Sequence, residues 1–183
     1  MPTQPDPSWL VGRVADSQDR LDGWLGSLTE RQVREPSALP GWTRAHVLAH
    51  IAGNAGTASE MFEGYARGED IPQYSGLPAR REDEIDADSS LPAAALLDLV
   101  RDTGARCLAA YRAMPDWDGT LRWQSERRPA TSWTGVTLAG DRDSPGRPGP
   151  WLFRGGLAGG FRRFPPTSRT APADRTGPVR DRA

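Results

Sequence analysis

The chain has 183 residues, with 23 basic and 24 acidic side chains and a formal net charge of −1. This balance gives no indication of nucleic acid or a membrane as a partner, and no run of 18 apolar residues could form a transmembrane helix. The single cysteine, Cys107, excludes an internal disulfide, and no apolar stretch typical of a secretory leader opens the chain. We therefore expect a cytoplasmic protein with one main domain.

Residues 7–28 are predicted to form a first helix, because leucine and valine recur there at helical spacing. Asp6 supplies an N-cap, and Pro7 suits the first helical position. The segment that follows, Thr29 to Gln32, has the spacing of a capping box and predicts one short turn.

Residues 43–67 give the strongest helix prediction, with Thr43 as N-cap and Gly68 just after the end. Trp42 and Val47 have the spacing of a hydrophobic staple. An apolar stripe runs along this helix, made of Val47, Ile51, Ala55, Ala58 and Phe62.

Residues 69–90 are predicted to be a polar, irregular connection, with Ile85 as the anchor of one helical turn in a solvated charge run. Residues 91–114 are predicted to form a third helix, capped near Ser90 and ended by Pro115. On this helix Cys107 is expected to be a small core residue. A short extended segment is expected at 117–123.

The composition changes near residue 130. Glu126 is the last glutamate, and residues 130–183 hold nine arginines, four aspartates and many glycines and prolines. We expect residues 131–183 to be a disordered basic tail, because this composition cannot bury enough apolar surface to offset its ordering entropy. One hypothesis is that the tail is translated out of frame; the competing hypothesis is a natural lineage that lost a site and gained a basic tail.

Both histidines, His46 and His50, lie in the second predicted helix at positions i and i+4, so they share a face and could bind one metal ion. The glutamate of the H-E-x-x-H metalloprotease motif is absent. In the alternative interpretation, His46 caps the first helical turn and His50 is a hydrogen-bonded, partly buried histidine.

The run from Leu39 to Ala52, L-P-G-W-T-R-A-H-V-L-A-H-I-A, resembles the signature of the mycothiol-dependent maleylpyruvate isomerase family, N-terminal metal-binding domain. The resemblance covers about residues 5–130 and implies an all-α fold, the DinB-like four-helix bundle. It also implies that His50 is a ligand of a divalent metal, with zinc expected, and that mycothiol is the thiol cofactor. In the family reaction a thiolate adds to a double bond, rotation follows, and the thiolate leaves.

The family completes its metal site with a Glu-x-x-x-His motif on the fourth helix. No histidine follows His50 here and no glutamate follows Glu126, so that motif is absent and the bundle is expected to be incomplete. The resemblance therefore predicts an isomerase or transferase with an incomplete metal site, acting on a small-molecule thiol and its substrate. Whether the chain is an enzyme stays open, since no catalytic or thiol-binding residue can be named.

Two other functions stay open beside this one. The chain could be a non-catalytic or defective helical domain without bound metal. The arginine-rich tail could also contact nucleic acid, although a solvated tail is the favoured interpretation. Neither the substrate nor the oligomeric state can be read from the sequence.

Overall fold

The structure is a computed structural model, and it describes residues 6–123 and 126–132. Its elements follow one another as α1 (Pro7–Leu25), α2 (Glu30–Arg34), α3 (Arg44–Ala66), the 3-10 helix η1 (Gln73–Gly76), α4 (Pro78–Asp88), α5 (Ala93–Arg112), β1 (Thr120–Trp123) and β2 (Glu126–Pro129). The all-α prediction is confirmed for these ranges, with one small hairpin added. None of their helices is long and apolar enough to cross a membrane.

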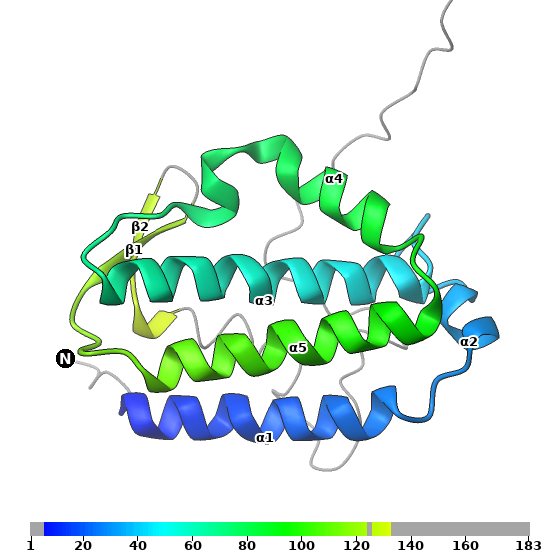
Figure 1. Ribbon diagram of the computed structural model, residues 1–183, viewed down its shortest axis with the longest axis horizontal. Helices are drawn as coiled ribbons and strands as arrows, with labels where there is room; N and C mark the ends of the chain where they lie inside the picture. Colours follow the sequence, from blue (N-terminus) through cyan, green and yellow to red (C-terminus); the bar gives the residue numbers. More distant parts are fainter. Residues whose placement is uncertain (1–5, 124–125, 133–183) are drawn as a thin grey trace, which may run out of the picture.

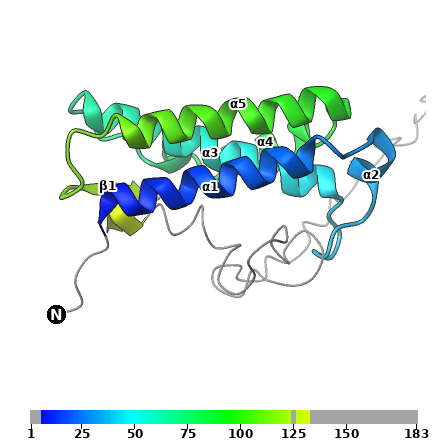
Figure 2. The ribbon, with the colours of Figure 1, turned by 90° about the horizontal axis from the view of Figure 1, so that it is seen from below.

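The long helices α1, α3 and α5 lie side by side, with α5 in contact with both of the others (Figures 1 and 2). Helix α4 packs against α3 on the side away from α5 (Figure 1). Helix α3 is therefore covered from several directions, and the residues predicted as its apolar stripe are buried or half-buried.

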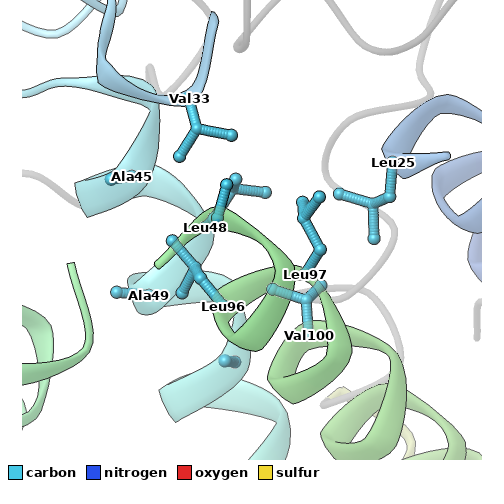
Figure 3. Packing of buried hydrophobic residues seen from close by; sticks show 10 residues of the cluster. Leu25, Val33, Ala45, Leu48, Ala49, Leu96, Leu97 and Val100 are labelled. Atoms are coloured by element: carbon cyan, nitrogen blue, oxygen red, sulfur yellow. The ribbon is translucent and has the colours of Figure 1, made fainter. Parts of the chain in front are cut away.

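The core consists of two apolar clusters along the helix bundle. The first joins α1, α2, α3 and α5 through small and branched side chains (Figure 3): Leu25, Val33, Ala45, Leu48, Ala49, Ala52, Ala93, Leu96, Leu97 and Val100. In the second cluster the ring of Phe62 meets the ring of Tyr111 edge-on, at a centroid distance of 4.5 Å. Cys107 is buried in this cluster, which confirms its prediction as a core residue.

The predicted helix boundaries hold where the capping residues are local. Asp6 accepts from the backbone N–H of Ser8, Thr29 and Gln32 form the predicted capping box, and Gly68 has a φ of +78° just after α3. Helix α1 ends at Leu25, three residues before the predicted end. Such end shifts of a turn or less are normal where no strong stop signal is present.

The N-cap of α5 is Pro92, two residues after the Ser90 near which it was predicted. Helix α5 begins at Ala93, and two contacts join its start to α2. The backbone N–H of Ala93 donates to Glu30 Oε2 at 2.7 Å, and Arg34 donates to the carbonyl of Ser89 at 2.6 Å. A carboxylate from a helix distant in sequence thus supplies the acceptor that a local cap would supply.

The irregular connection predicted over 69–90 was wrong in its second half. Residues Pro78–Asp88 form helix α4, with Pro78 in the first turn and Ile85 buried. Arg80 donates to Glu84 one turn on and also reaches Glu60 on α3. Buried apolar surface and cross-helix ion pairs therefore fix this charged segment as a helix.

The extended segment predicted at 117–123 is confirmed in part as β1, and its partner β2 was not predicted. The two strands pair antiparallel, with Arg122 opposite Arg127. Asp70, which lies after α3, accepts from both of these arginines at 2.5 Å. One carboxylate thus offsets the repulsion between two cross-strand arginines and holds the hairpin near the end of α3.

Candidate functional site

The candidate site is centred on His50, which lies in the second turn of α3 with its ring partly buried. The ring of Trp42 meets the His50 ring edge-on at a centroid distance of 5.9 Å. Trp42 also lies 6.0 Å from the ring of His46, so the one indole contacts both histidines. The predicted placement of the histidines on one helix face is confirmed by this shared neighbour.

The two histidines have different hydrogen-bonding roles. His46 is part of the N-terminal cap of α3, where its Nδ1 accepts from the backbone N–H of Thr43 at 3.3 Å. The capping interpretation of His46 is therefore confirmed. Because this hydrogen bond uses the lone pair on Nδ1, the His46 ring stabilises the N-terminus of α3.

Both ring nitrogens of His50 lie beside protein nitrogen atoms. The side-chain amide of Asn54 places Nδ2 at 3.1 Å from His50 Nε2, and Arg81 Nη2 lies 3.4 Å from His50 Nδ1. Burial, and then the positive charge of Arg81, lower the pKa of His50 to about 4. The imidazole is therefore neutral near pH 7.

A buried tyrosine extends this contact chain. The hydroxyl of Tyr74 donates to Asn54 Oδ1 at 2.9 Å, while the backbone N–H of Tyr74 donates to Thr57 Oγ1 at 2.6 Å. Burial raises the pKa of the Tyr74 phenol, so it stays protonated. Tyr74 and Ser75 have φ values of 51° and 54°, a left-handed backbone that non-glycine residues rarely adopt.

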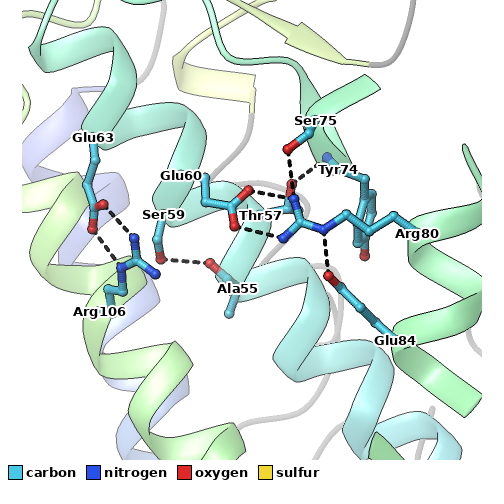
Figure 4. Close-up of polar contacts among 10 residues, drawn as sticks. All are labelled: Ala55, Thr57, Ser59, Glu60, Glu63, Tyr74, Ser75, Arg80, Glu84 and Arg106. Atoms are coloured by element: carbon cyan, nitrogen blue, oxygen red, sulfur yellow. Dashed lines mark hydrogen bonds and ion pairs between the residues drawn. The ribbon is translucent and has the colours of Figure 1, made fainter. Parts of the chain in front are cut away.

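An arginine clamp keeps this turn against α3 (Figure 4). Arg80 donates to both carboxylate oxygens of Glu60, at 2.8 and 2.9 Å, to Glu84 Oε1 at 2.6 Å and to Ser75 Oγ at 2.8 Å. Hydrogen bonds to Glu60, more than any other contact, raise the pKa of Arg80. The clamp joins α3, η1 and α4 into one polar layer that contains His50.

Sequence reasoning singled out His50 but missed the role of its neighbours. Asn54 lies one turn further along the same helix, a spacing that could have indicated a contact with His50. Tyr74 and Arg81 come from other elements, and no local pattern marks them.

An open groove of about 450 Å³ is lined by seven residues in the range 77–88, and His50 is not one of them.

A catalytic divalent metal needs several protein ligands grouped around one point. Among residues 6–123 and 126–132, no three histidine, cysteine or carboxylate side chains are grouped so that they could hold a metal ion. His50 contributes at most one ligand, and a catalytic zinc site takes three protein ligands as a rule. The donors present in this part of the chain do not fit a catalytic metal. The prediction of a disordered tail at 131–183 lies outside the described residues, except for residues 131 and 132.

The chain was compared with known families and structures. Residues 14–140 match the family model of the mycothiol maleylpyruvate isomerase N-terminal domain. The crystal structure of the mycothiol-dependent maleylpyruvate isomerase is similar with a TM-score of 0.68 and 26% identity, over 73% of this chain and 57% of that one. A histidine-to-alanine mutant of that enzyme gives a TM-score of 0.68 and 25% identity, over 74% and 57%. No curated protein matches the sequence.

The chain thus spans 57% of the length of the solved relatives. The family match begins inside α1, covers the remaining described elements and includes His50 with its polar layer. The helical fold agrees with the resemblance that the histidine run indicated. The chain belongs to the mycothiol maleylpyruvate isomerase N-terminal domain family.

Proposed function

We propose that this chain is a member of the family with an incomplete metal site, a helical domain that binds no catalytic divalent metal by itself. The supporting observation is the donor set around His50. Its ring nitrogens lie beside Asn54 and Arg81, and no second metal-ligating side chain stands with it among the described residues. In the remaining sequence no histidine and no glutamate are present to complete the family motif.

A zinc titration of the full chain, monitored by isothermal titration calorimetry, tests this proposal. We expect no stoichiometric binding that depends on His50, so the wild type and His50→Ala should give the same titration curve. His46→Ala serves as the matched control for loss of an imidazole from the same helix. Tight binding of one zinc ion per chain that His50→Ala abolishes and His46→Ala retains would contradict the proposal.

The second candidate function is the family activity itself, a thiol-dependent isomerase or transferase that uses mycothiol and a divalent metal. Membership of the family favours it, since the matched region contains the His50 position. This function requires that maleylpyruvate isomerises faster in the presence of the chain, mycothiol and zinc than with mycothiol and zinc alone. The first proposal predicts equal rates with and without the chain.

We also propose that the gene is read out of frame beyond the hairpin. The support is the change in composition after Glu126. The codons from about 129 to 140 are the region to examine in the gene. Translation of the other two frames should show an amphipathic helix with Glu-x-x-x-His, and its absence from both frames would favour a natural basic tail.

A further inference from the structure

His50 stands at the end of a hydrogen-bond chain that starts in a strained turn. The hydroxyl of Tyr74 contacts Asn54 Oδ1 at 2.9 Å, and Asn54 Nδ2 contacts His50 Nε2 at 3.1 Å. The direction of these hydrogen bonds does not depend on whether His50 binds zinc. The direction decides which ring nitrogen carries the proton, because a neutral imidazole has one N–H and one lone pair.

The phenol of Tyr74 determines the orientation of the amide. Tyr74 is only 4% exposed, and Asn54 is the one hydrogen-bond partner of its hydroxyl in the described part of the chain. If the amide were turned over, the hydroxyl would accept from Nδ2 and its own proton would lie buried without an acceptor. The phenol therefore donates to Oδ1, and Nδ2 donates to His50.

Contacts that hold the strained turn also fix the position of the Tyr74 phenol. Tyr74 and Ser75 both adopt left-handed φ values, and such a conformation persists where surrounding contacts over-determine it. Here Thr57 Oγ1 accepts from the backbone N–H of Tyr74 at 2.6 Å, and Arg80 donates to Ser75 Oγ at 2.8 Å. The position of the hydroxyl is thus fixed by contacts independent of His50.

Among the contacts of His50 within the described residues, Arg81 offers the competing assignment. A guanidinium can only donate, and Arg81 Nη2 lies 3.4 Å from His50 Nδ1, so a strong bond here would require the lone pair on Nδ1. The Asn54 contact is the shorter of the two and is tied to a buried phenol. We propose that Tyr74 and Asn54 are positioning residues that hold His50 as the tautomer with its proton on Nδ1 and its lone pair on Nε2.

His46 provides an internal reference. Its Nδ1 lies 3.3 Å from the backbone N–H of Thr43, which can only donate, and 2.8 Å from Thr43 Oγ1, so we expect its proton on Nε2. The two histidines of the chain, four residues apart on one helix, then have opposite tautomers. Long-range proton–nitrogen correlation spectra distinguish the two tautomers by which ring nitrogen is protonated.

The experiment records these spectra on the nitrogen-labelled full chain near neutral pH with a chelator present, so the outcome is independent of zinc binding. The wild type should give one ring of each tautomer. Asn54→Asp replaces the donor with a carboxylate that can only accept, so the His50 proton should move to Nε2 and both rings should then give the same pattern. Tyr74→Phe should give a mixture of tautomers at His50.

Arg81→Met is the matched control and should leave the His50 tautomer unchanged. Unchanged His46 signals and an unchanged far-ultraviolet circular dichroism spectrum establish that each variant is folded. A wild-type His50 with its proton on Nε2 would overturn the proposal without any variant. A tautomer that changes in Arg81→Met and not in Asn54→Asp would assign the control of the ring to Arg81.

Discussion

Acidification is expected to destabilise the fold through His50. The unfolded chain takes up a proton on this ring at its ordinary pKa of about 6.5, whereas burial and Arg81 hold the folded-state pKa at about 4. Between these two values the unfolded state binds more protons than the folded state. The stabilisation is therefore fully present above about pH 6.5 and is lost as the pH falls toward 4.

The size of the effect follows from the two pKa values of His50. Proton linkage gives a loss of about 2 kcal/mol in the free energy of unfolding at about pH 5, rising to about 3 kcal/mol at about pH 4. This is a large part of the roughly 5–15 kcal/mol that stabilises an ordinary domain. Urea unfolding followed by tryptophan fluorescence, at a series of pH values, measures it.

The comparison with His50→Gln isolates the contribution of the ring. Protonation of carboxylates lowers the stability of both proteins, so the difference between wild type and variant reports His50. The wild type should lose about 2 kcal/mol more than His50→Gln between neutral pH and about pH 5. A His50→Gln profile parallel to that of the wild type would refute the reasoning.

Three further predictions concern packing. Gly64→Ala should lower the free energy of unfolding by about 1–2 kcal/mol, because a Cβ there would lie 2.7 Å from Ile71 Cδ1. Gly56 is the control on the same helix, since a Cβ there meets no atom within 4 Å. Gly56→Ala should therefore raise the free energy of unfolding by about 0.5–1 kcal/mol in the same urea assay. Phe62→Ala should cost about 3–5 kcal/mol, since the ring is fully buried against other aromatic rings, and a loss below about 1 kcal/mol would contradict this packing. Burial raises the pKa of the Cys107 thiol to about 11, so an alkylating reagent should label it in urea and not in the folded chain at neutral pH.

The helix that carries His50 could be predicted from sequence because its signals are local. Thr43 and Gly68 mark its ends, and an apolar stripe between them gives its period. The same is true of α2, whose capping box lies within four residues. Local signals work here because cap geometry and side-chain period depend on neighbours along the chain.

The elements that surround His50 could not be predicted in the same way. Helix α4 looks like a solvated charge run, and it is fixed as a helix by Arg80 reaching Glu60 across twenty residues. Tyr74 lies in a turn whose φ values contradict the propensity of its residues. Contacts between distant segments override local preference at both places, which is why the polar layer appears only in the folded chain.

The i and i+4 spacing of the histidines predicts a shared face, and the folded chain shows why a shared face is weak evidence for a shared metal. His46 uses its lone pair at the helix cap, and His50 has its Nε2 beside the Asn54 amide. A metal ion at His50 Nε2 would have to displace that amide and leave the Tyr74 hydroxyl to find another arrangement. Two rings on one face bind a metal only where both lone pairs are open toward the same point, and here local hydrogen bonds direct them to different partners.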